Sequence, residues 1–259
     1  MVAACAAALV LVGCALSPAA APQLRPHATA SPHATHTVAW SVVALGDSVP
    51  AGGGCGCTPF PQLSASRLSV HHVRDVTATN DAVNGATSTD VLDAVTTDHR
   101  VESDLSGADI VEIEVGANDV EFNAACGTTV SCYQEALPAV ERNLRDIVAQ
   151  VQDLTAAHGA LVVLLDYWNV WLGGSYAQAQ GPAYVAAATT LTDQVDTLVR
   201  EVAADTGSAY VDLRAAFKGP DYSGDETRLL APDGDHPNGQ GHARIAQAVV
   251  DAVTSRLDL

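Results

Sequence analysis

Apolar runs alternate with stretches of helical periodicity along most of the chain. Five short runs rich in Val, Ile, Leu and Ala predict strands at 38–45, 73–79, 108–115, 160–165 and 208–213. Between them, longer stretches with a helical repeat of apolar residues predict helices at roughly 87–98, 136–158, 182–206 and 240–257. Gly159 and Gly207 stand where two of these helices would end. Strands that alternate with long helices predict a parallel sheet covered by helices on both faces.

Two of the predicted strands end in polar turns that contain glycine. The first runs through "VALGDSVPAG", so that Ser48 follows Gly46 and Asp47, and the third ends at "GAND", which contains Asn118. In parallel sheets, function gathers at the carboxyl ends of the strands. Ser48 is therefore a candidate nucleophile, although a strand-to-helix turn with Asp47 or Ser48 as a helix cap would use the same residues.

The segment "APDGDHPNGQGH" near the C-terminus carries a candidate general base. Asp233 precedes His236 by three residues, which lets its carboxylate reach the imidazole, fix the tautomer and stabilise the imidazolium. The alternative is an ordinary loop before the last helix, in which Asp caps and His is incidental. Asp235 and His242 flank the pair, and we expect them to serve loop and helix structure.

Acyl transfer from a serine also needs donors for the developing oxyanion. Gly85, in "VNGATSTDVL", follows the second predicted strand and offers a backbone N–H, while Asn118 offers a side-chain amide. Each has a structural alternative, Gly85 as a turn residue and Asn118 as a loop cap. The four motifs, which contain Ser48, Gly85, Asn118 and His236, are more specific together than any one of them alone.

In this order and at these strand ends, the motifs resemble those of the SGNH hydrolase superfamily, the GDSL esterases and lipases, over about residues 38–257. Val49 departs from the eponymous Leu. The resemblance implies a three-layer α/β/α sandwich with a flavodoxin-like five-stranded parallel sheet. It implies Ser48 as nucleophile, His236 as base and Asp233 as the residue that orients it. It also implies an oxyanion hole of the Ser48 and Gly85 N–H groups and the Asn118 side chain.

The resemblance further implies an exported serine esterase that forms an acyl-enzyme and needs no metal or organic cofactor. Its partner would be a small or polymer-borne ester substrate. A carbohydrate O-acetyl esterase is the alternative enzyme, and a non-catalytic, surface-tethered binding module is the alternative from another class. Trp168 and Trp171, after the fourth predicted strand, would either contact substrate or pack the loop onto the core.

Other nucleophile and nucleotide motifs do not fit these residues. Pro50 stands where the nucleophile elbow of α/β-hydrolases has its second glycine. The glycines at 52–54 lack both the dinucleotide-binding spacing and the lysine of a P-loop. The net charge of −18, with Lys218 as the single lysine, argues against binding to nucleic acid or anionic membrane surfaces.

The N-terminal residues predict export. Residues 1–16 contain an apolar run too short to span a bilayer comfortably, and Leu11 to Cys14 resembles a lipobox, so Cys14 is a candidate lipid anchor. Secretion without an anchor is the alternative. Residues 17–36 have the composition of a flexible linker, in which three histidines (His27, His33 and His36) are better explained by a solvated tether than by a metal site. The hydrolase domain is then 37–259.

Four cysteines lie in the predicted domain. Export to an oxidising compartment makes disulfides the expected state. Cys126 and Cys132 bracket a short loop and would pair easily, whereas Cys55 and Cys57 are so close that a mutual bridge would be strained, though feasible. A zinc site is a weaker alternative because C-x-C lacks the usual spacing.

Overall fold

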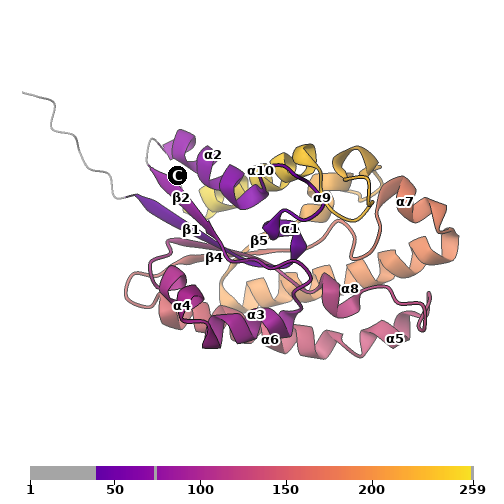
Figure 1. Ribbon diagram of the computed structural model, residues 1–259, viewed down its shortest axis with the longest axis horizontal. Coiled ribbons are helices and arrows are strands. Elements are labelled where there is room, and N and C mark those ends of the chain that lie inside the picture. Colours follow the sequence, from indigo (N-terminus) through magenta and orange to yellow (C-terminus); the bar gives the residue numbers. More distant parts are fainter. Residues whose placement is uncertain (1–38, 73–74, 258–259) are drawn as a thin grey trace, which may run out of the picture. The chain divides into compact units, whose positions relative to one another are not determined.

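A sheet of five parallel strands forms the middle layer of the domain (Figure 1). The computed structural model describes residues 39–72 and 75–257. The strands lie in the order β2-β1-β3-β4-β5. They are β1 (Trp40–Gly46), β2 (Val76–Asn80), β3 (Ile110–Glu114), β4 (Leu161–Leu165) and β5 (Ala209–Val211). The predicted export signal, linker and anchor at Cys14 lie outside the described residues.

Helices cover both faces of this sheet, as predicted (Figure 1). One face carries α2 (Phe60–His72), α9 (Leu213–Lys218) and α10 (Gly239–Arg256), and the other carries α3 (Ser88–Thr97), α4 (His99–Ser106), α6 (Leu137–Leu154) and α8 (Pro182–Thr206). Because successive strand side chains point to opposite faces, Val42 packs in the first of these two cores and Val43 in the second. The fold is the expected three-layer α/β/α sandwich.

The strand order reverses between β1 and β3. From β1 the chain crosses to β2 on one side, whereas the next strand, β3, pairs with β1 on the other side, with Gly46 opposite Glu114 at the carboxyl edge. The connections after β1 and β3 therefore diverge and leave a crevice, which is where open α/β sheets bind ligands. Ser48 and Asn118 follow these two strands.

The apolar pattern predicted all five strands and four of the helices (α3, α6, α8 and α10) within a few residues. It did not predict α2, α4 or the short helices. These are α1 (Ser48–Ala51), α5 (Val130–Gln134), α7 (Gly174–Ala179), α9 and the 3₁₀ helices η1 (Ala117–Val120) and η2 (Thr227–Leu229). The buried positions of α2 (60, 61, 64, 65 and 68) have helical spacing, but polar Ser64 is among them and apolar Val70 is exposed, so the apolar pattern along this stretch is weak. None of the described helices is both long and apolar enough to cross a membrane.

The structure contains two disulfides. Cys126 pairs with Cys132, as predicted, with their Cα atoms 5.8 Å apart. Cys55 also pairs with Cys57, with a Cα separation of 5.1 Å. The second bridge, which the sequence left open, closes the loop that joins α1 to α2.

Candidate active site

Ser48 is placed by a sharp turn at the end of β1. A Cβ on Gly46 would collide with the carbonyl oxygen of Glu114 in β3, and the φ of Gly46 is +139°, so this position requires glycine. The next residue, Asp47, caps α1 by accepting a hydrogen bond from the Val49 N–H at 3.0 Å. Ser48 is thus the first residue of α1, at the carboxyl edge of the sheet.

A cavity of about 300 Å³ opens beside Ser48. Its lining combines residues from the loops after β1, β3, β4 and η2. The polar members include Ser48, Asn118, Asn169, Asp235 and His236, and the aromatic members are Phe122, Tyr167, Trp168, Trp171 and Tyr184. A concave site that combines aromatic side chains with a few convergent polar groups is typical of small-molecule pockets.

A hydrogen bond of 2.9 Å joins His236 Nδ1 to Asp233 Oδ2. The other carboxylate oxygen of Asp233 accepts hydrogen bonds from the backbone N–H groups of Asp235 and His236, each at 3.0 Å. Burial alone would raise the pKa of Asp233, but these hydrogen bonds outweigh it and lower the pKa below its ordinary value. An ionised Asp233 places the imidazole proton on Nδ1 and leaves Nε2 as the basic nitrogen.

His236 and Ser48 lie close to each other beside Gly53. A Cβ on Gly53 would lie 3.0 Å from His236 Cδ2 and 3.0 Å from Ser48 Cβ, so the two side chains flank the same point. No hydrogen bond joins them in the described part of the chain. Such contacts are often long without substrate and tighten when it binds.

Asp235 lies closer to the site than the sequence indicated. Its Oδ2 atom is 4.0 Å from His236 Nδ1, beyond hydrogen-bond range, and its side chain lines the cavity. The expectation that Asp235 serves only loop structure is therefore incomplete, because this carboxylate is part of the cavity wall. His242, by contrast, is fully buried on α10, as expected for a residue that supports a helix.

Two candidate oxyanion donors lie at the Ser48 cavity. The Asn118 side-chain amide donates one hydrogen bond to the Ala86 carbonyl, at 2.9 Å, which leaves its second N–H for a ligand. No hydrogen bond occupies the backbone N–H of Ser48 among the described residues. Both groups are candidates to donate to an oxygen bound beside Ser48.

Gly85, the third candidate donor, lines a neighbouring cavity of about 290 Å³ and not the Ser48 cavity. The residue before it, Asn84, has its Oδ1 atom 3.0 Å from the same Cβ position on Gly53 that Ser48 and His236 flank. Sequence reasoning did not select Asn84. Its place in an Asn-Gly turn after β2 was the available signal, but such turns are common in loops.

A cluster of buried acidic side chains lies next to the turn that carries Ser48. The Tyr167 hydroxyl donates to Asp47 Oδ2 at 2.6 Å, and Asp47 and Glu114 are both almost fully buried. Burial raises the pKa of Asp47 to about 6, against the lowering effect of the Tyr167 and Val49 hydrogen bonds. Burial, and then the charges of Asp47 and Asp166, raise the pKa of Glu114 well above its ordinary value. Sequence reasoning missed this cluster because its members come from three separate strand ends.

Trp168 and Trp171 act chiefly as packing residues. Their side chains are only 1% and 3% exposed. Trp168 stacks on Phe217 with ring centroids 4.3 Å apart, and the Trp171 indole N–H donates to the Val120 carbonyl at 2.7 Å. They fix the loop after β4 and contribute apolar surface to the cavity.

Comparisons with known proteins agree with this architecture. A sequence model of the GDSL-like lipase/acylhydrolase family matches residues 44–244, which include Ser48, Asn118 and His236. A lipase from Streptomyces rimosus is 28% identical over 251 residues, which cover 88% of this chain and 91% of that protein.

Solved structures share the fold. The crystal structure of the lipase Lip_vut3 from a goat rumen metagenome superposes with a TM-score of 0.65 at 18% identity, covering 82% of this chain and 97% of that one. The acetylxylan esterase Axe2 from Geobacillus stearothermophilus superposes with a TM-score of 0.59 at 22% identity, covering 83% and 94%. With the family match spanning most of the domain, the chain belongs to the GDSL-like lipase/acylhydrolase family and is an ester hydrolase.

Proposed function

We propose that this protein is an exported serine esterase that hydrolyses carboxylic esters through a covalent acyl-enzyme. One observation carries the mechanism. Asp233 binds His236 at Nδ1, and His236 and Ser48 lie beside the same point at Gly53 and line one cavity together with Asn118. This is the relation of nucleophile, base and orienting carboxylate that serine hydrolases use on several unrelated folds.

In the first half-reaction, Ser48 Oγ attacks the acyl carbon while His236 Nε2 takes its proton. The negative charge on the former carbonyl oxygen is stabilised by the Ser48 N–H and the free Asn118 N–H. When the intermediate collapses, the C–O bond to the alcohol breaks and His236 returns the proton to the leaving oxygen. A water molecule then repeats both steps on the acyl-enzyme and releases the acid.

The proposal of export rests on the apolar N-terminal residues together with the two disulfides, which persist in oxidising compartments. The sequence of the first residues also makes Cys14 a candidate lipid anchor, so the protein would be secreted or held at the outer face of the cell membrane. Globomycin-sensitive processing and radiolabelled palmitate incorporation, compared with Cys14→Ala, would distinguish the two.

The catalytic proposal is tested with p-nitrophenyl esters of increasing acyl length and with acetylated xylo-oligosaccharides. We expect Ser48→Ala to lower turnover of every hydrolysed substrate by at least about 10³-fold. Ser103→Ala, at an exposed serine on α4, is the matched control and should match wild type. A folded Ser48→Ala variant with wild-type turnover contradicts the proposal. The substrate arms separate a general esterase from a carbohydrate O-acetyl esterase.

A further inference from the structure

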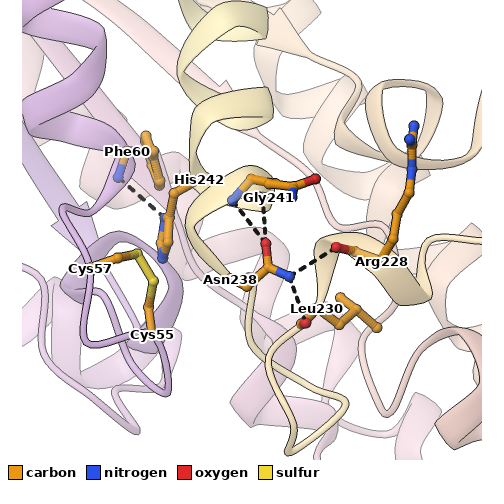
Figure 2. Close-up of a disulfide and its surroundings, with 9 residues drawn as sticks. Cys55, Cys57, Phe60, Arg228, Leu230, Asn238, Gly241 and His242 are labelled. Atoms are coloured by element: carbon orange, nitrogen blue, oxygen red, sulfur yellow. Dashed lines mark hydrogen bonds between the residues drawn. A yellow bond between two sulfur atoms is a disulfide. The ribbon is translucent and has the colours of Figure 1, made fainter.

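The loop between α1 and α2 holds a disulfide beside a buried histidine. Cys55 and Cys57 are bonded to each other and are both partly exposed. Figure 2 shows the ring of His242, on α10, with one nitrogen toward Phe60 and the other edge toward the disulfide. The two sulfur atoms and a ring nitrogen of His242 lie within 4.8 Å of one another.

The hydrogen bonds of His242 define where its proton lies. The backbone N–H of Phe60 donates to His242 Nδ1 at 3.3 Å, so Nδ1 carries a lone pair. Burial, and then the nearby charge of His236, lower the pKa of His242 to about 4, which keeps the ring neutral at neutral pH. Its one ring proton is therefore on Nε2. Among the described residues this buried Nε2 has no hydrogen-bond partner.

A buried N–H without an acceptor is uncommon and costs free energy. A cysteine thiolate at this disulfide would supply the missing acceptor, and a neighbouring donor stabilises the thiolate relative to the thiol. A metal ion bound by the same three residues would need a lone pair on Nε2, which carries the proton. The geometry therefore favours a thiol–thiolate site over a metal site.

The two disulfides differ in loop length and in their neighbours. Cys55 and Cys57 are separated by two positions, against six for Cys126 and Cys132. Loop length does not by itself decide which bond is reduced first, because a short loop also costs little entropy to close in the unfolded chain. The thiolate stabilised by His242 lowers the free energy of the reduced form at Cys55–Cys57, and Cys126–Cys132 has no such donor among the described residues. The partial exposure of Cys55 and Cys57 gives an external thiol access.

The same loop packs against the proposed catalytic pair. A Cβ on Gly54 would collide with Asp233 Oδ2 and would lie 2.9 Å from His236 Cβ, so the loop backbone lies directly against both residues. Gly53 has the corresponding contacts with Ser48 and His236. A change in the conformation of this loop would therefore shift the imidazole of His236.

We propose that Cys55 and Cys57 form a redox-active site for thiols, with His242 as the donor that stabilises the thiolate, and that its reduction lowers esterase activity by loosening the support of His236. One sulfur of an external dithiol attacks the Cys55–Cys57 bond, and its second sulfur resolves the mixed disulfide. The dithiol is oxidised to a disulfide, and its two electrons and two protons pass to Cys55 and Cys57. Where one cysteine remains a thiolate, its proton goes to solvent instead. The effect on activity rests on the proposed function, whereas the thiol chemistry does not.

Equilibration with mixtures of reduced and oxidised dithiothreitol tests the thiol chemistry, with alkylation and peptide mapping as the readout. Cys126–Cys132 is the internal control. We expect half-reduction of Cys55–Cys57 at a ratio of reduced to oxidised reagent at least about tenfold lower than for the control, which is about 30 mV in midpoint potential. Reduction of both disulfides at the same ratio, or of Cys126–Cys132 first, overturns the proposal.

The role of His242 is tested by the rate of alkylation of the reduced loop at pH 7. His242→Met removes the donor and should slow alkylation about tenfold, while His242→Gln keeps a side-chain N–H and should restore part of the rate. In the wild-type protein, the pH dependence of alkylation should give an apparent thiol pKa below the ordinary value of about 8.5. An ordinary or higher value contradicts the role of His242 even where the variants fail to fold.

The coupling to catalysis is tested by measuring kcat before and after selective reduction, beside the double variant Cys55→Ser, Cys57→Ser. Reduction should lower kcat several-fold in the wild type and leave the double variant unchanged at its own lower value. A selectively reduced enzyme with full kcat overturns the coupling. If neither redox state hydrolyses any ester, the proposed function fails, and the redox titration still decides the thiol site.

Discussion

Asp233 and Asp235 both approach His236 Nδ1, but only Asp233 lies at hydrogen-bond distance, 2.9 Å against 4.0 Å. Asp233 is also fixed by two backbone N–H groups, which aim its second oxygen at the ring. The i−3 spacing that the sequence shows is what allows this, because the chain turns back through Gly234 between the two residues. At the residue scale, the orienting role therefore belongs to Asp233.

We expect Asp233→Asn to lower kcat at least roughly tenfold, or about 1.4 kcal/mol of barrier, because the amide no longer stabilises the imidazolium or enforces the tautomer. Asp235→Asn, the matched variant two residues away, should stay within about threefold of wild type. Both values come from kcat on one chromogenic ester. A larger loss for Asp235→Asn would mean that the wrong carboxylate has been assigned.

At the element scale, apolar runs predicted the strands because a sheet covered on both faces buries nearly every side chain. The same rule explains a feature that the sequence did not reveal. Strand β3 reads as alternating apolar and polar residues, yet Glu112 and Glu114 are fully buried. Helix α2 was missed because a polar residue stands on its buried face, where Ser64 donates a hydrogen bond to Glu112 at 2.6 Å.

The carboxyl of Glu112 should make stability depend on pH. Burial raises its pKa from 4.5 to about 8, and the Ser64 hydrogen bond opposes this only in part. Between these two values the unfolded chain has released a proton that the native state keeps, so the free energy of unfolding falls as pH rises, by up to about 1.4 kcal/mol per pH unit. Below pH 4.5 the carboxyl is mostly protonated in both the folded and the unfolded state, so Glu112 no longer makes the free energy of unfolding depend on pH.

Glu112→Gln keeps an acceptor for Ser64 and removes the titration. We expect its unfolding free energy, measured by urea denaturation from pH 5 to pH 8, to fall less steeply with pH than that of wild type. Glu135→Gln, at an exposed position, is the control and should keep the wild-type slope. Equal slopes for all three proteins would show that Glu112 is ionised in the native state throughout this range.

For the molecule as a whole, the negative net charge is matched by acidic side chains that line the cavity. The net charge is −18. Asp47, Glu121 and Asp235 line the cavity, and none of its described lining residues is Lys or Arg. Such a field attracts cationic ligands and repels anionic ones, and salt screens it. Composition predicted the sign of this field, but only the fold shows that it reaches the site.

We expect kcat/KM at low ionic strength to be at least about tenfold higher for a choline ester than for a hemisuccinate ester of matched acyl length. This ratio of kcat/KM values should shrink in 0.5 M salt, where the screening length is about 4 Å. Glu121→Gln should lower the ratio, whereas Glu135→Gln, away from the cavity, should not. A ratio that is independent of salt and of Glu121 would place the discrimination in shape and not in charge.

The proposed mechanism requires that Ser48 is the nucleophile and that His236 activates its oxygen. Its most direct test is intact-mass and peptide analysis after treatment with a fluorophosphonate, which bonds covalently to activated serines. We expect one adduct per chain, located on Ser48, in wild type and Ser103→Ala, and none in a folded Ser48→Ala variant. An adduct that persists in Ser48→Ala, or wild-type protein that hydrolyses esters without being labelled at Ser48, would contradict this mechanism.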